Sequence, residues 1–158
     1  MKKRLLHVCV TSLVVLGSMV SVSAQTATQK SPRPERRVVK LPGRTSTVPI
    51  SPAIVVGDLV FTSGQIGFDP KTNQMPETLD AQAEQVLLNL KAVLEAAGSD
   101  MSRVLKTTVF LADMNDYAAM NEVYKRHFKE DPPARSAVQV AKLPANAKIE
   151  IEAVALLK

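Results

Sequence analysis

The stretch TLDAQAEQVLLNLKAVLEAAG, Thr78 to Gly98, decides the fold class of this 158-residue chain. Thr78 is a favourable N-cap, and Gly98 can end a helix because glycine adopts the left-handed conformation without strain. The apolar residues between them recur at the spacing of one helical face: Val86, Leu90, Val93, Leu94 and Ala97. We therefore predict a helix that buries a single stripe, and the surrounding sequence must supply the surface that this stripe covers.

The flanking sequence has the composition of β-strands. Ala53–Ile66 reads AIVVGDLVFTSGQI and predicts two strands joined by a tight turn at Gly57-Asp58. Arg103–Asp113 is rich in valine, threonine and phenylalanine, which favour strands. Lys148–Leu157 alternates, with Ile149, Ile151, Ala153 and Ala155 on one face and Glu150 and Glu152 on the other.

A second helix is predicted at Asn115–Phe128, with Tyr117, Met120, Tyr124 and Phe128 facing inward. Two prolines forbid its continuation, and PPARSAVQV (Pro132–Val140) then reads as a short strand opened by Arg135. This order of strands, helix, strand, helix and strands predicts an α+β fold with both helices on one face of a sheet. The uncovered face is expected to carry Val104, Phe110, Ala137, Val154 and Leu156, and such a face favours oligomerisation.

The N-terminus has the three-part pattern of a secretory signal peptide. Basic residues open the chain, an apolar run follows to Val22, and cleavage is expected after Ala24. A retained membrane anchor is the alternative, but the run is weakly apolar for a span. Residues 25–37 are polar and read as a flexible arm, and residues 38–158 as one domain. We expect a periplasmic or secreted protein without stable membrane association after cleavage.

Cleavage narrows the possible chemistry. It removes three of the 20 basic residues, which leaves 17 against 15 acidic ones, a balance that does not favour nucleic acid as a partner. It also removes Cys9, so the mature chain would have no thiol, and His127 would be its remaining histidine. A zinc site made of nitrogen and sulfur ligands is therefore excluded.

Candidate site residues gather near the ends of the predicted strands. Arg135 opens one strand, Glu150 lies on the polar face of another, and Ser63 and Gly64 close a third. Asn121 lies on the second helix. An arginine fork binds a carboxylate through two hydrogen bonds, and a nearby glutamate orients or deprotonates a water molecule. The alternative is an Arg–Glu ion pair that satisfies a subunit interface.

Four stretches together resemble the reactive intermediate deaminase family, also called RidA or YjgF. They are VVGDLVFTSGQI, KTTVFLADMNDYAAMNEVY, PPARSAVQVAKLP and KIEIEAVA, and the resemblance covers roughly residues 48–157. It implies a chorismate-mutase-like fold and a homotrimer with clefts between subunits. It also implies hydrolysis of 2-imino acids or enamines, such as 2-iminobutanoate or 2-iminopropanoate, to 2-keto acids and ammonia, without a metal or organic cofactor.

The resemblance also implies residue roles. Arg135 would hold the substrate carboxylate and Glu150 would orient the attacking water, while Ser63, Gly64 and Asn121 would line the cleft. Two positions depart from the family pattern: Ile50 stands where a tyrosine is usual, and Ala137 where cysteine is frequent. Ile50 and the signal peptide favour a second hypothesis, a non-catalytic trimeric module that binds small carboxylates or acts as a holdase.

Overall fold

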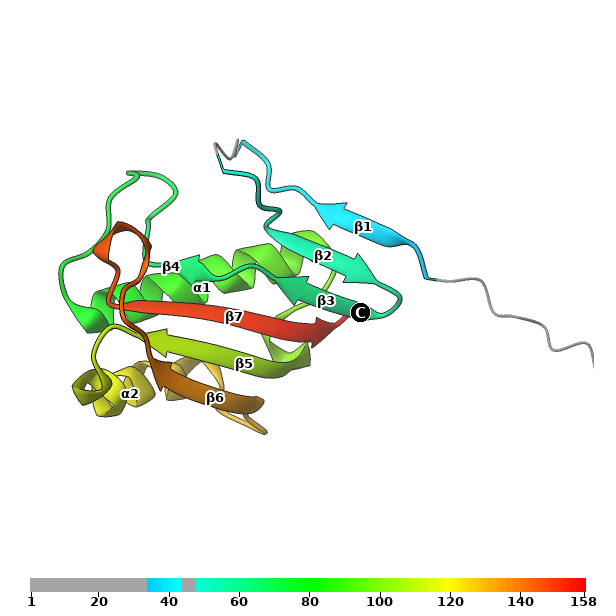
Figure 1. The fold of residues 1–158 in the computed structure, drawn as a ribbon. Helices are drawn as coiled ribbons and strands as arrows, with labels where there is room; N and C mark the ends of the chain where they lie inside the picture. The colour runs from blue at the N-terminus through cyan, green and yellow to red at the C-terminus, as the bar shows by residue number, and fades with distance from the viewer. Residues whose placement is uncertain (1–33, 44–47) are drawn as a thin grey trace, which may run out of the picture. The chain divides into compact units, whose positions relative to one another are not determined.

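The computed structural model describes residues 34–43 and 48–158, so the predicted signal peptide and most of the arm lie outside the described residues. The described chain forms a seven-stranded sheet in the order β1-β2-β3-β7-β5-β6, with β4 also paired to β7 (Figure 1). The β5–β6 pair is parallel and the others are antiparallel. The strands are β1 (Arg36–Val39), β2 (Ala53–Val56), β3 (Leu59–Thr62), β4 (Gln65–Ile66), β5 (Val104–Leu111), β6 (Ala134–Gln139) and β7 (Ile149–Leu156).

Both long helices, α1 (Leu79–Ala97) and α2 (Tyr117–His127), cover the same face of the sheet (Figure 1). Three short 3-10 turns occupy connections, at Met101–Arg103, Met114–Asp116 and Pro144–Asn146. The predicted α+β fold with one helical layer is confirmed. None of the helices in the described chain is long and apolar enough to cross a bilayer.

The first helix has the limits that its sequence predicts. The Thr78 hydroxyl accepts a hydrogen bond from the backbone of Ala81 at 3.3 Å, and Gly98 ends the helix at φ +92°. All five residues of the predicted stripe are buried. The sheet itself begins at Arg36, two residues before the expected start of the domain at Val38. Arg37 of this first strand donates to the Ala97 carbonyl at 2.9 Å, which satisfies a free carbonyl at the end of α1.

The expected alternation in β7 is confirmed. Ile149, Ile151, Ala153 and Ala155 are buried beneath the helices, while Glu150 and Glu152 lie on the other face and are partly exposed. The uncovered face also carries Phe61, with 43% of its surface exposed, and the partly exposed Phe110, Val154 and Leu156. An apolar strip therefore crosses the sheet on the side that has no helix.

Three placements predicted from the sequence are wrong. Val104 is buried in the core, because a bulge between Val104 and Lys106 reverses the alternation at the start of β5. Ala137 lies on the helical face, since the parallel register pairs it with the buried Val109. Tyr117, the first residue of α2, is 40% exposed and does not face inward. Val123 is a buried residue of this helix that the prediction did not include.

Two buried amides of α1 hold the ends of the central strands. Gln82, 4% exposed, accepts from the backbone N–H of Lys148 at 2.8 Å and donates to the Pro76 carbonyl at 2.7 Å. Asn89 donates to the carbonyls of Ile66 and Phe68 at 2.9 and 2.8 Å. These bonds fix the loop after β4 and the entry to β7 against the helix.

Replacing Gln82 with leucine should lower the free energy of unfolding by about 1–3 kcal/mol, because the Lys148 N–H and the Pro76 carbonyl then lack their partner. Denaturant unfolding measures the change. Glu95→Gln is the control: its exposed pair with Lys91, at 3.9 Å, should contribute less than about 0.5 kcal/mol. Equal effects of the two substitutions would contradict the anchoring role of Gln82.

Candidate functional site

Arg135 lies on the helix-facing side of β6, held by aromatic and amide groups of α2. Its register partner in β5 is Thr107, which is fully buried under the helices. The guanidinium lies 4.6 Å from the ring centroid of Tyr124, whose hydroxyl is bonded to Thr107 at 2.7 Å. One terminal nitrogen, Nη2, donates to Asn121 Oδ1 at 2.7 Å and to the Tyr117 hydroxyl at 3.2 Å. The cation is therefore oriented by several contacts rather than by an acidic partner.

A pocket of about 520 Å³ opens beside this guanidinium. It is lined by Met114, Tyr117, Arg135 and Ala137. Ala137 follows Arg135 by two residues on the same side of β6, and its single methyl group leaves the space beside the cation free. Arg135, Asn121 and Ala137, all predicted from the sequence, thus lie together.

Glu150 forms a second cluster with the turn that joins β3 to β4. Its carboxyl carbon lies 2.6 Å from the place where a Cβ of residue 64 would stand, so any side chain at this position would displace the carboxylate. Ser63 donates through its hydroxyl to the Ser51 carbonyl at 2.7 Å. The neighbouring Ile50 is 59% exposed. Ser63, Gly64 and Glu150 are therefore brought together as expected, with Ile50 one residue from the Ser51 carbonyl.

Burial raises the pKa of the Glu150 carboxyl above its usual range, and the negative charge of Glu152 raises it further. Within residues 34–43 and 48–158, no group donates a hydrogen bond to the Glu150 carboxylate. A carboxylate with a raised pKa and no bonded donor is a stronger base than an ordinary surface glutamate, which suits it to accept a proton from water.

The two clusters lie on opposite faces of the sheet. Arg135 pairs with Thr107, which faces the helices, whereas Glu150 pairs with Phe110, which faces away from them. A single copy of the chain therefore cannot place Arg135 and Glu150 around one small ligand. The sequence alone does not predict whether Arg135 and Glu150 share a face of the sheet, because it does not fix the strand register.

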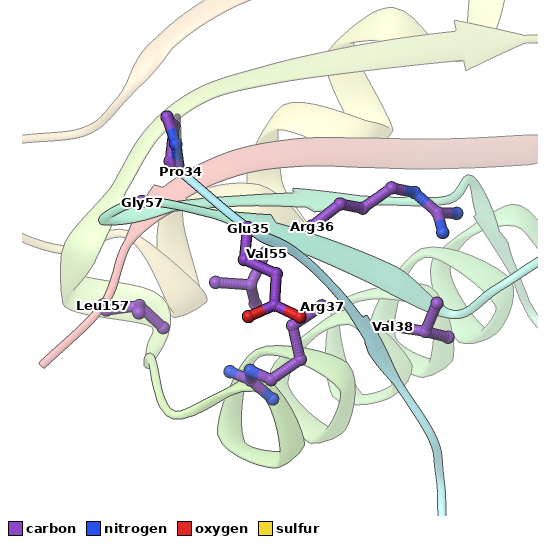
Figure 2. A pocket seen from close by; sticks show the side chains of 8 residues that line it. All are labelled: Pro34, Glu35, Arg36, Arg37, Val38, Val55, Gly57 and Leu157. Atoms are coloured by element: carbon purple, nitrogen blue, oxygen red, sulfur yellow. The ribbon is translucent and has the colours of Figure 1, made fainter. Parts of the chain in front are cut away.

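A second pocket, of about 600 Å³, lies at the β1 edge (Figure 2). It is lined by Pro34, Glu35, Arg36, Arg37, Val38, Val55, Gly57 and Leu157. Of its charged residues, Arg37 already donates a hydrogen bond to the Ala97 carbonyl at the end of α1. None of the site residues predicted from the sequence lines this pocket, whereas Arg135 and Ala137 line the smaller one, which is therefore the better candidate.

The remaining ionisable groups of the described chain do not form a competing site. His127 contacts Glu84 at 2.9 Å, which links the two helices at their edge. No group of three or more potential metal ligands occurs among the described residues.

Sequence comparison identifies the family. The family model described as Endoribonuclease L-PSP matches residues 44–157. The human 2-iminobutanoate/2-iminopropanoate deaminase is 47% identical over 125 residues, covering 77% of this chain and 90% of the human protein. The chain belongs to the RidA/YjgF family. A RutC family protein of Pyrococcus horikoshii is 52% identical over 108 residues, covering 68% and 86% of the two chains.

Solved RidA-family structures agree with the fold. RidA from an Antarctic Psychrobacter matches with a TM-score of 0.72 at 42% identity, over 77% of this chain and 99% of the other. Escherichia coli TdcF, solved with bound serine, matches with a TM-score of 0.73 at 40% identity, over 77% and 99%.

Tyr117 is the site residue that sequence reasoning assigned to the core. Tyr117 lines the pocket and accepts a hydrogen bond from Arg135. The buried Met120 also contacts Arg135, through its sulfur at 3.7 Å. The signal that could have identified Tyr117 is its spacing from Asn121, because residues four apart share one face of a helix.

The raised pKa of Glu150 predicts a pH-dependent effect on stability. Folding disfavours the ionised form, so this group's contribution is present below about pH 4, the ordinary range of glutamate, and is lost as the pH rises through the raised pKa. Glu150→Gln should therefore unfold at a higher temperature than the parent at pH 7, and the two should converge at low pH.

Glu122→Gln is the matched control. A hydrogen bond from Lys125 lowers the pKa of Glu122, so this substitution should not stabilise the protein at pH 7. Thermal unfolding from pH 3 to 8 measures all three proteins. A Glu150→Gln variant less stable than the parent at pH 7 would show instead that a cation partners this carboxylate.

Proposed function

We propose that this protein hydrolyses 2-imino acids, or their enamine tautomers, to 2-keto acids and ammonia. The observation that carries the proposal is the pair of half-sites: an oriented guanidinium beside a pocket, and a carboxylate of raised pKa packed on a glycine. Three mammalian relatives at 47–49% identity are named 2-iminobutanoate/2-iminopropanoate deaminases, which supports the same reaction class here.

In this proposal Arg135 binds the substrate carboxylate and thereby fixes the imine carbon beside it. Asn121 keeps the guanidinium in place through its 2.7 Å bond. The small Ala137 side chain leaves room for the substrate. The serine bound in TdcF, a compound with an α-carboxylate, supports a ligand of this kind.

Glu150 would then activate the water. It takes a proton from the water as the oxygen attacks the carbon of the imine, whose nitrogen is protonated, and this gives a tetrahedral amino alcohol. Glu150 returns that proton to the nitrogen and then takes the proton of the new hydroxyl as the C–N bond breaks, so that the C=O bond of the 2-keto acid forms. The ammonia that leaves takes up this last proton from Glu150. These steps consume one water molecule and need no redox partner, metal or organic cofactor. Gly64 keeps the carboxylate against the backbone, while Ser63 and Ile50 form the adjoining wall.

The proposal includes a homotrimer, because the half-sites lie on opposite faces of one sheet. A ring of copies would bring Arg135 of one subunit to Glu150 of the next, since head-to-tail contacts repeat the same interface. The exposed apolar strip with Phe61 and Phe110 would be covered in the same assembly.

The activity test compares the parent with Arg135→Lys and Glu150→Gln. Lysine retains the charge but loses the planar fork, and a displacement of the imine by about 1 Å costs on the order of 100-fold in rate. Both variants should lose most of the hydrolysis of 2-iminobutanoate, generated by an amino-acid oxidase and followed as ammonia release. Parent-like activity in Arg135→Lys would contradict the assignment.

Mixing the two variants tests the shared site. If subunits of both kinds are unfolded and reassembled together in equal amounts, about one quarter of the shared sites should combine an intact Arg135 with an intact Glu150. Activity should return to roughly that fraction of the parent's, whereas a site contained in one subunit would show no recovery.

A second candidate function is a non-catalytic trimeric module that binds small carboxylates or acts as a holdase. The exposed Ile50 favours it, because this apolar side chain stands where the family pattern has a hydroxyl. Tight binding of 2-oxobutanoate by a parent protein that does not accelerate ammonia release would support the binder.

Arg135-dependent cleavage of RNA would instead support a nuclease, the activity that the family description names.

We also propose that the chain is exported, with residues 1–24 acting as a signal peptide and the mature protein periplasmic or secreted. Expression of the full chain in a bacterium should yield a periplasmic protein whose N-terminal sequence begins at Gln25. A cytoplasmic protein that retains Met1–Ala24 would contradict export.

A further inference from the structure

The guanidinium of Arg135 has no free Nη2 hydrogen within its own subunit. Nη2 carries two hydrogens, and it donates to Asn121 Oδ1 at 2.7 Å and to the Tyr117 hydroxyl at 3.2 Å. Nη1 makes a longer contact, 3.7 Å, with the sulfur of Met120. The Nη2 end of the fork is thus already engaged by two side chains of α2.

This arrangement limits how a carboxylate binds. A carboxylate can take two parallel bonds from Nη1 and Nη2, or from Nε and Nη2. Each mode needs one Nη2 hydrogen, so two-point binding must displace either Asn121 or Tyr117.

Of these two hydrogen bonds to Nη2, the one to Tyr117 is the more easily broken. Its bond to Nη2 is 0.5 Å longer than that of Asn121, and its side chain is exposed and lines the pocket. The two groups also differ in chemistry. Asn121 presents a carbonyl oxygen to the guanidinium, which would repel a carboxylate, whereas a tyrosine hydroxyl accepts one hydrogen bond and still has a proton to donate.

We propose that Tyr117 is a substrate-binding residue that selects for a carboxylate, an inference that rests on the proposed function. On binding, one carboxylate oxygen takes the Nη2 hydrogen that the Tyr117 hydroxyl accepted, and the hydroxyl donates its own hydrogen to the same oxygen. Three donors then meet the carboxylate, two from Arg135 and one from Tyr117. The contact between the Tyr117 ring and the guanidinium, 5.6 Å from centroid to Cζ, needs no change.

This arrangement predicts selectivity for the charged group. A carboxylate accepts all three hydrogen bonds, whereas a primary amide presents one oxygen and an NH₂ group that is itself a donor. The hydroxyl of Tyr117 should therefore favour 2-keto and 2-imino acids over their amides, and its removal should reduce that preference.

The test uses Tyr117→Phe, with Tyr124→Phe as its matched control. Both substitutions remove one hydroxyl from a ring beside the same guanidinium, but the Tyr124 hydroxyl is buried on Thr107. The Kd of 2-oxobutanoate, measured by calorimetry on the assembled protein, should rise on the order of 10-fold in Tyr117→Phe, because a hydrogen bond to a charged group is lost. The same Kd should change less than about twofold in Tyr124→Phe. Loss of the buried hydrogen bond to Thr107 should instead lower the melting temperature of that variant.

Two further measurements complete the experiment. The Kd of 2-oxobutanamide should be nearly equal in parent and Tyr117→Phe. In the ammonia-release assay, Tyr117→Phe should raise KM for 2-iminobutanoate and leave kcat within about twofold, because the hydroxyl binds the carboxylate and not the reacting carbon. Equal or tighter binding of 2-oxobutanoate by Tyr117→Phe would overturn the inference, since the hydroxyl would then only occupy the arginine.

Failure of the inference and failure of the proposed function give different results. If the parent releases ammonia but the Kd of 2-oxobutanoate is unchanged in Tyr117→Phe, the proposed function is supported and the role of Tyr117 is contradicted. If the parent binds 2-oxobutanoate in a Tyr117-dependent way but does not hydrolyse the imine, the carboxylate site is supported and the deaminase activity is contradicted. A parent that does not bind 2-oxobutanoate overturns the role of Tyr117, and ammonia release then reports on the function separately.

Discussion

The pairing of β5 with both β6 and β7 is the constraint on which the site depends. The parallel β5–β6 register aligns Arg135 with Thr107, and the antiparallel β5–β7 register aligns Glu150 with Phe110. Because successive side chains point to opposite faces of a strand, these registers send the cation toward the helices and the carboxylate away from them. A shift of one residue in either pair would reverse one of the two groups and bury a charge or expose the core.

The helical layer supplies what the sheet alone cannot, the fixed orientation of a long and flexible arginine. Tyr124 packs beneath the guanidinium, and Asn121 accepts from its edge. In α1, Gln82 and Asn89 bind the backbone at the entry to β7 and at the end of β4. The same helices that bury the apolar core therefore hold the segments that carry Arg135, Gly64 and Glu150, so stability and site geometry share one set of contacts.

Periodicity predicted most of the fold, and its failures have local causes. The stripe of α1, its Thr78 and Gly98 caps and the alternation of β7 follow from patterns within one segment, and each is confirmed. Val104 and Ala137 were misplaced because a bulge and a parallel register are properties of strand pairs, which one segment does not encode. Tyr117 was assigned to the core because a tyrosine on an apolar helix usually packs inward. The buried roles of Gln82 and Asn89 were missed because an amide at a core position looks like a surface residue until its backbone partners are known.

Separation of the two charged groups explains how Glu150 remains a base. Had both side chains shared one face of the sheet, a direct ion pair with Arg135 would have lowered the glutamate pKa and left a weaker proton acceptor. With the sheet between them, Arg135 is satisfied by neutral groups of α2, and the pKa of Glu150 stays raised by burial and by Glu152. In the proposed trimer, the carboxylate of the ligand, not Glu150, would neutralise the guanidinium. In the proposed mechanism, charge complementarity therefore selects the substrate without weakening the base that activates the water.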